Sequence, residues 1–142
     1  MTTILADIRH GVMVADTNFG DGDTRGQMRK VWRMRRLGAL VGLAGNLDEM
    51  APFLLWVREG MQPPGPRIPH LSALMLQPSG LLLFEGSCAP IVVQGRCMGI
   101  GSGAKAALAA HEALGYADPA RAVRIVCRYD ANSRAPVRTY RL

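Results

Sequence analysis

The chain has 142 residues, of which 49% are hydrophobic and 20% are charged, and its formal net charge is +6. This size predicts one soluble globular domain over residues 1–142, and no run approaches the ~18 apolar residues that a membrane-spanning helix needs. The basic residues fall in separate groups and only 6% of the chain is aromatic. Nucleic-acid binding is therefore less favoured than a basic surface that is solvated or that meets an acidic neighbour.

The first part of the chain is predicted to form two antiparallel hairpins, because apolar and polar side chains alternate or cluster in four short runs. A polar, glycine-rich loop separates the two hairpins. The second hairpin places Met28, Lys30 and Trp32 on one face of its first strand. The predicted strands cover residues 2–9, 12–15, 28–34 and 39–45, and the loop covers residues 17–26.

A helix over residues 47–59 is predicted next, because Asn46 is a suitable N-cap and Glu49 occupies the capping-box position. The following residues 61–69 contain four prolines and are not expected to be helical. The remaining elements predict an α+β fold, with antiparallel sheets packed between helices. They are strands over 72–77, 81–85, 91–93, 96–100 and 136–141, and helices over 104–114 and 118–128.

Targeting and metal signals are weak in this sequence. The first residues alternate between polar and apolar side chains and include Asp7, which does not fit a signal peptide and favours a cytoplasmic protein. Neither a disulfide framework, a zinc site nor a cofactor is expected, because the cysteines are odd in number without CxxC spacing and the histidines show no ligand spacing. These residues are Cys88, Cys97 and Cys127, and His10, His70 and His111.

The beginning of the chain carries a candidate nucleophile. Threonine is small, so methionine aminopeptidase normally removes a methionine in front of it, which would leave Thr2 with a hydroxyl and a free amine. An N-terminal amine has a pKa of roughly 7.7–8.0 and can serve as the base for a neighbouring hydroxyl. The alternative is that Thr2 is an ordinary strand residue.

Four further residues are candidates for the same chemistry. Lys30 stands out because 15 of the 17 basic residues are arginine, and lysine is a compact charge whose pKa shifts on burial. Asp16 ends a predicted strand, and Gly42 has a bare backbone that could face a substrate. Ser102 precedes a predicted helix. The structural alternatives are a surface lysine, a turn cap, a close-packing glycine and a helix cap.

Five short motifs, in this order, resemble the proteasome β-subunit family and most closely its HslV-type members. Each motif alone is weak, but the ordered set over residues 2–46 and 99–113 is specific. The motifs are Thr2-Thr3-Ile4, Asp16 in VMVADTNF, GQMRKV over 26–31, Gly42-Leu43-Ala44-Gly45 and Ile100-Gly101-Ser102-Gly103.

The resemblance implies a four-layer αββα sandwich of the N-terminal nucleophile hydrolases and a threonine endopeptidase with an acyl-enzyme intermediate. Thr2 would attack the peptide carbonyl, Lys30 would lower the pKa of the nucleophile, and Asp16 would hold Lys30. The Gly42 N–H would stabilise the oxyanion and Ser102 would relay protons. The residues implied to shape the substrate pocket are Met28, Trp32 and Asn46.

One departure from the family concerns the layer of helices. Family members usually have two helices between the Gly-x-Ala-Gly turn and the next hairpin, whereas proline-rich residues 61–72 replace the second helix here. We therefore expect a reduced helical layer. The implied partners are a polypeptide substrate and further copies in a homo-oligomer, while ring size and an ATPase unfoldase stay open. A catalytically inactive assembly or scaffold protein on the same fold is the alternative function.

Overall fold

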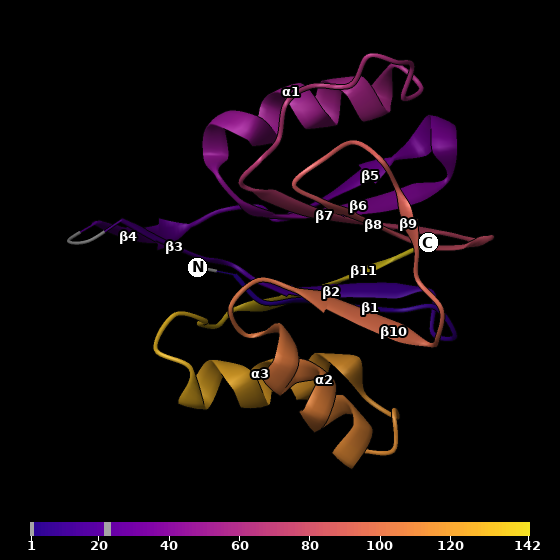
Figure 1. Ribbon diagram of the computed structural model, residues 1–142. Helices are drawn as coiled ribbons and strands as arrows, with labels where there is room; N and C mark the ends of the chain where they lie inside the picture. The colour runs from indigo at the N-terminus through magenta and orange to yellow at the C-terminus, as the bar shows by residue number, and fades with distance from the viewer. Residues whose placement is uncertain (1, 22–23) are drawn as a thin grey trace.

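The computed structural model describes residues 2–21 and 24–142, and it contains two antiparallel sheets with helices on their outer faces (Figure 1). The four-stranded sheet begins with the chain and has the predicted C-terminal strand at its edge, next to the second strand. Its strands, in order across the sheet, are β10 (Cys97–Ile100), β1 (Ile4–Asp7), β2 (Val12–Asp16) and β11 (Val137–Arg141).

The five-stranded sheet is a meander in which each strand pairs with the next one in the sequence. A short 3₁₀ helix, η1 (Arg35–Leu37), connects its first two strands and ends at Gly38 in the left-handed conformation. The strands are β5 (Val31–Met34), β6 (Ala39–Gly45), β7 (Leu71–Gln77), β8 (Gly80–Glu85) and β9 (Ile91–Val92).

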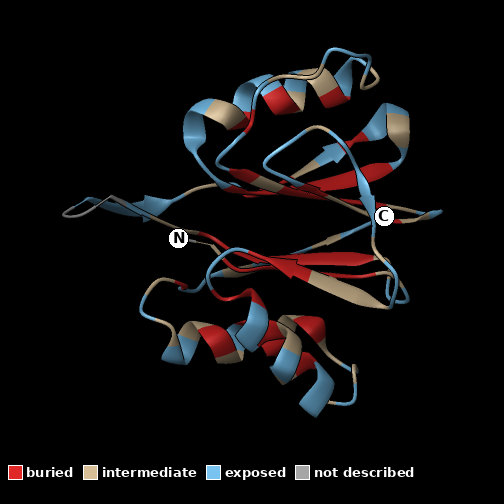
Figure 2. Cartoon of the chain, viewed as in Figure 1, coloured by how far each residue is buried: buried red, intermediate tan, exposed pale blue. Residues whose placement is uncertain are grey.

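Alternating side chains place the two sheets face to face. Ile4, Ala6 and Met13 of the first hairpin join one buried cluster with Leu40 and Leu74 of the five-stranded sheet. The strand residues that alternate with these point to the outer face of their sheet, because successive side chains of a strand leave opposite faces. Figure 2 shows buried residues concentrated along both sheets and on the helix faces that meet them.

Helices cover the two outer faces of this pair of sheets (Figure 1). α1 (Leu47–Arg58) packs Phe53 and Val57 on the five-stranded sheet. α2 (Ala104–Ala113) and α3 (Pro119–Tyr129) pack on the other sheet through small and branched residues. The predicted antiparallel sheets with packed helices are therefore confirmed. In the described part of the chain, no helix is long and apolar enough to span a membrane.

The predicted helix starts are observed with one difference in detail. The Asn46 side chain accepts a hydrogen bond from the Asp48 N–H (3.2 Å), and the Asp118 side chain accepts one from the Arg121 N–H (2.9 Å). Glu49 does not complete a capping box. Its carboxylate accepts the His70 N–H instead, at 2.9 Å, and so joins the start of α1 to the segment before β7.

The prediction of an irregular loop over residues 17–26 was wrong. β3 (Asn18–Asp21) and β4 (Thr24–Gln27) pair as a separate hairpin, which projects beyond the two sheets in Figure 1. The residues of β4 are all exposed, so no alternation of buried and exposed side chains marks it in the sequence. Residues 22–23 of the predicted loop, and Met1, lie outside the described residues.

The strand predicted over 28–34 begins only at Val31. The Met28 N–H donates to the Thr17 carbonyl (2.9 Å), so this residue still belongs to the base of the β3–β4 hairpin. Lys30 therefore precedes β5 instead of lying within it. Its carbonyl accepts the Leu43 N–H at 3.0 Å, which attaches the backbone of Lys30 to β6.

We predict that Gly42→Ala destabilises the fold. A Cβ atom at this buried position would lie 2.7 Å from the Met13 sulfur and 3.0 Å from Ile4 Cγ2, so the two sheets must separate locally. We expect the free energy of unfolding, measured by urea denaturation, to fall by about 1–3 kcal/mol. Gly26→Ala is the control, because its Cβ would meet only Phe19, at 3.9 Å; equal losses in both variants would contradict the close packing of the sheets.

Candidate active site

Thr2 lies just before β1, in a pocket of about 560 Å³. The pocket is bounded by the end of β6, the start of β7 and the turn between β10 and α2. This turn closes on the backbone of Thr2: the Gly103 N–H donates to the Thr2 carbonyl at 3.4 Å. A Cβ at Gly101, whose φ is +90°, would lie 2.0 Å from the same oxygen. Besides Thr2, the lining residues are Ala44, Gly45, Pro69, His70, Leu71, Ser72, Glu85, Gly101 and Ser102.

A buried ion pair lies directly beside this chain start. Lys30 and Asp16 are 2% and 0% exposed, and the Lys30 Nζ atom donates to Asp16 Oδ1 at 2.9 Å and to Oδ2 at 3.1 Å. The Thr3 N–H donates to the same Oδ1 atom at 2.7 Å. One carboxylate oxygen therefore binds both the ammonium and the backbone of the residue that follows Thr2, which places the charge of Lys30 next to the beginning of the chain.

The environment of Lys30 opposes its charge. Burial has the largest effect and lowers the pKa of Lys30 below its usual 10.5, while the negative charge of Asp16 and its hydrogen bonds act in the opposite direction. The Asn18 N–H also donates to Asp16, with 3.2 Å between the nitrogen and Oδ2. The carboxylate is thus held by donors from three segments, which fixes the position of the ammonium.

Gly42 does not face the Thr2 pocket. It pairs with Val31 on one side and Leu74 on the other, in the middle of the sheet. The Leu43 N–H is directed to Lys30, and N–H groups of successive strand residues point to opposite sides, so the Gly42 N–H points toward β7. Its predicted role as the oxyanion donor is therefore corrected, because this N–H belongs to the ladder of the sheet.

Gly45, at the end of the same motif, lines the Thr2 pocket. By the same alternation the Gly45 N–H points to the β5 side of β6. No residue of β5 pairs with Gly45, because the pairing of β5 with β6 ends at Val31 and Gly42. Its φ is +126°, and a Cβ would lie 2.1 Å from the His70 carbonyl oxygen, so the position accepts only glycine. The sequence analysis missed this residue, although its place immediately before the N-cap of α1 was a usable signal.

The other predicted residues fall into two groups. Ser102 is exposed and lines the pocket together with Thr2; its side chain does not cap α2, whose N-cap is Gly103. The three predicted substrate-binding residues are not in this pocket. Met28 packs against the core beneath α1, Asn46 caps α1, and Trp32 lines a different pocket. The predicted alternation of residues 28–34 fails here because residues 28–30 precede the strand.

A second polar chain, which the sequence analysis missed, approaches from the segment after α3. The Thr3 and Ser133 hydroxyl oxygens lie 2.5 Å apart, and the Ser133 hydroxyl contacts the Asp130 carboxylate at 2.7 Å. Ser133 is fully buried. The only sequence signal was an aspartate and a serine three residues apart in a polar segment, which is common in turns.

Structural comparison places this arrangement among known proteins, whereas comparisons with protein-family models and with curated proteins find no match. HslV from Trypanosoma brucei is 20% identical with a TM-score of 0.76, and the alignment covers 98% of both chains. Thiobacillus denitrificans BPH is 18% identical with a TM-score of 0.67, covering 98% of this chain and 95% of BPH. The Anbu (Gly-1) mutant from Hyphomicrobium sp. strain MC1 is 15% identical with a TM-score of 0.71, covering 98% and 80%.

The chain has the proteasome-like fold. The resemblance that five sequence motifs indicated is thereby confirmed for the fold, over nearly the whole chain. The pocket at Thr2 lies where this proteasome-like chain begins, and the Lys30–Asp16 ion pair joins its two sheets at that end.

A third polar cluster lies at the opposite end of β1, around the fully buried Asp7. Its Oδ2 atom contacts His111 Nε2 at 2.7 Å, His10 Nδ1 at 3.0 Å and Arg96 Nε at 3.1 Å. His10 and His111, which show no ligand spacing in the sequence, thus meet in the structure at one buried carboxylate.

The ligand atoms of Asp7, His10 and His111 lie within 4.8 Å of one another, a spacing that a metal ion could use. The Arg96 guanidinium already contacts Asp7, and its Nη2 atom lies 3.2 Å from His10 Nδ1. The Arg96 guanidinium therefore balances the charge of the Asp7 carboxylate, and we assign the cluster a structural role in this proteasome-like fold.

The losses of stability on replacing Lys30 and Asp16 are expected to be non-additive. Asp16→Ala removes the carboxylate that balances the buried Lys30 ammonium, so we expect a loss of about 3–5 kcal/mol in the free energy of unfolding. Lys30→Met leaves a buried carboxylate. The Asp16→Ala, Lys30→Met double variant should lose less than the sum of the single losses, measured by urea denaturation in a double-mutant cycle. Additive losses would show that the two charges do not interact.

Asp7→Asn should weaken the protein at neutral pH. Burial raises the pKa of Asp7, but hydrogen bonds from His111, His10 and Arg96 together lower it by more than burial raises it. The pKa of Asp7 therefore lies well below its usual 3.8. The ionised carboxylate therefore stabilises the fold above about pH 4, and this contribution is lost as the pH falls toward the folded-state pKa. We expect a loss of about 2–3 kcal/mol at pH 7, shrinking at pH 3, by urea denaturation. Glu59→Gln, at an exposed position, is the control and should show neither effect.

Proposed function

We propose that the protein is a threonine-type endopeptidase whose nucleophile is Thr2, exposed by removal of Met1. One observation carries this proposal: Asp16 Oδ1 binds the Lys30 ammonium at 2.9 Å and the Thr3 N–H at 2.7 Å. A buried ammonium held beside an amino-terminal hydroxyl is what this chemistry requires, because its positive charge favours the alkoxide that develops during attack.

The proposed reaction has two steps. The Thr2 Oγ atom attacks the peptide carbonyl carbon while the Thr2 amine accepts its proton; collapse of the tetrahedral intermediate breaks the C–N bond, and the amine returns the proton to the leaving group. Water then attacks the resulting ester, and the Thr2 hydroxyl is regenerated as the acid product leaves. Lys30 stabilises the developing negative charge on Oγ and stays protonated throughout.

The oxyanion donor in this proposal is the Gly45 N–H instead of that of Gly42. Gly45 lines the Thr2 pocket and its N–H points away from the paired part of the ladder. The loss of one such donor typically raises the barrier by about 2.7–4 kcal/mol. Ser102, from the turn that closes on Thr2, and the Ser133–Asp130 pair beside Thr3 would position the amine and transfer protons.

We propose that the two sheets and their outer helices form the αββα sandwich of the N-terminal nucleophile hydrolases, with α1 alone in one helical layer.

We also propose that several copies of the chain associate. Exposed apolar side chains support association: Leu47 and Leu55 of α1 are 48% and 52% exposed. Such residues on a helix are suited to contacts between subunits.

A catalytically inactive assembly protein on the same fold is the second candidate. It is favoured by one finding, namely that none of the three residues expected to bind the substrate lies in the Thr2 pocket. Loss of labelling and of peptide hydrolysis in Thr2→Ala separates this candidate from the peptidase.

The test uses epoxomicin, the ligand in a second structure of Thiobacillus denitrificans BPH, which is 18% identical with a TM-score of 0.66 and is covered over 96% of its length. We expect the intact mass of the assembled protein to show Met1 removed and one inhibitor molecule added. Thr2→Ala should take up none, and Lys30→Met should react at least about a hundredfold more slowly.

Thr139→Ala, at an exposed position on β11, is the matched control and should react like the original protein. If Met1 is retained, the measurement is repeated on a fusion cleaved so that Thr2 comes first. A correctly assembled protein with a free Thr2 that neither reacts nor hydrolyses peptides would refute the peptidase proposal.

A further inference from the structure

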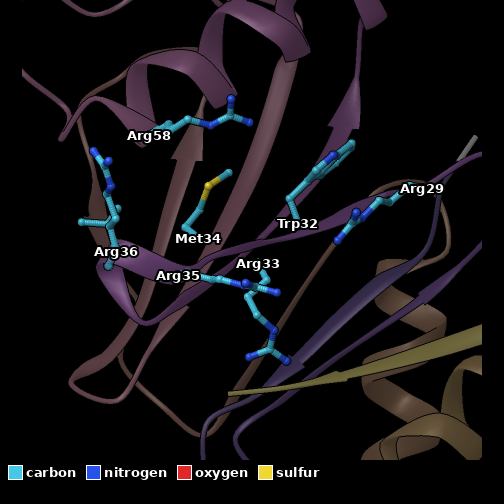
Figure 3. A pocket seen from close by; sticks show the side chains of 8 residues that line it. Arg29, Trp32, Arg33, Met34, Arg35, Arg36 and Arg58 are labelled. Atoms are coloured by element: carbon cyan, nitrogen blue, oxygen red, sulfur yellow. The ribbon is translucent and has the colours of Figure 1, made fainter.

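A second pocket, of about 460 Å³, lies beside β5 and η1 at the C-terminal end of α1 (Figure 3). It shares no lining residue with the Thr2 pocket. Five of the eight lining residues are arginines. Four of them come from the stretch of chain that runs from just before β5, through it and into η1, and the fifth is the last residue of α1. They are Arg29, Arg33, Arg35, Arg36 and Arg58.

No carboxylate balances these arginines within the described residues, where the ion pairs involve only Asp7 and Asp16 as acids. Arg29 donates to the Val31 carbonyl at 2.7 Å and Arg33 to the Arg141 carbonyl. Each guanidinium has five N–H donors, so both retain donors for a ligand. All five arginines are exposed, so water and salt screen their mutual repulsion. Because arginine stays charged in proteins, the group presents a permanent positive charge to an anion.

The uncharged part of the lining limits the size and kind of anion. In Figure 3, Trp32 lies between Arg58 and Arg29, and Met34 lies beside Arg58. Trp32 is only partly buried, so part of its indole is open to a ligand. A volume of about 460 Å³ falls in the range of small-molecule sites. The pocket therefore suits a compact ligand with several negative charges and not an extended acidic chain.

We propose that this pocket binds a small molecule that carries a run of phosphates. Phosphate oxygens accept two parallel hydrogen bonds from one guanidinium, and consecutive phosphates bring several charges to one place. A single carboxylate would offset only one of the five charges. Inorganic tripolyphosphate and a nucleoside triphosphate share this chemistry, and they differ in whether a base is present to stack on Trp32. The proposal does not depend on the chemistry of Thr2.

The experiment is a calorimetric titration of the assembled protein with tripolyphosphate and, separately, with ATP, both without Mg²⁺ and at two salt concentrations. We expect binding of tripolyphosphate that weakens with salt and a rise of the unfolding temperature with ligand. Arg35→Gln combined with Arg36→Gln should weaken it by about tenfold or more. The matched control removes two exposed arginines of α3, by Arg124→Gln and Arg128→Gln, and should change the affinity less than about twofold.

Trp32→Leu distinguishes the two sources of phosphate. A loss of affinity for ATP alone assigns the pocket to a nucleotide, whereas unchanged and equal binding of both ligands assigns it to inorganic tripolyphosphate. If the double arginine variant does not fold, Arg58→Gln on α1 replaces it. Equal losses in pocket and control variants, tighter binding of an acidic peptide or an oligonucleotide than of tripolyphosphate, or no binding at low salt would each overturn the proposal.

Discussion

The buried ion pair between Lys30 and Asp16 connects the parts of this molecule on which its proposed chemistry depends. Asp16 ends β2 of one sheet and Lys30 precedes β5 of the other, so their contact joins the two sheets at one end. Burying both charges costs several kcal/mol, which is offset only by good geometry and complete hydrogen bonding. The carboxylate meets this condition, because it accepts from Lys30 and from the backbone of Thr3 and Asn18.

Glycines allow the chain to approach itself closely around Thr2. A side chain at Gly101 would collide with the Thr2 carbonyl, one at Gly103 with the Thr3 hydroxyl, and one at Gly45 with the His70 carbonyl. These contacts come from different segments, yet all border the beginning of β1. Gly45 and Gly101 thus bring backbone to the wall of the pocket, and a backbone N–H is a fixed donor that needs no reorganisation during a reaction.

The type of basic residue differs between the buried ion pair and the pocket beside β5. Lysine is used at the buried site, where a compact ammonium fits against one carboxylate, while arginines occupy the half-open pocket beside β5. The Asp7 cluster at the other end of β1 stabilises the same sheet, and its carboxylate is fully buried. The two ends of one strand therefore serve different purposes, with Thr2 at the first and a structural carboxylate at the second.

Much of the fold could be predicted from local patterns, because alternation and capping act over a few residues. The two hairpins of the sheets, the capped start of α1 at Asn46 and the small-residue helix after Gly103 are examples. The β3–β4 hairpin escaped prediction, since the residues of β4 are all exposed and leave no alternating pattern in the sequence. The same holds for the start of β5, which depends on a hydrogen bond between Met28 and Thr17.

For the site, the sequence by itself determined the residue types: a threonine at the start, one lysine among arginines, an aspartate after a strand and a glycine-rich motif before a helix. Only the tertiary structure decided which of them meet. It brought Thr2, Asp16, Lys30 and Ser102 to one end of the sheets. It also placed Gly45 instead of Gly42 at the Thr2 pocket, and Trp32 in another pocket. The physical reason is that side-chain and N–H directions reverse at every strand residue, so a shift of a few residues decides which group faces the pocket.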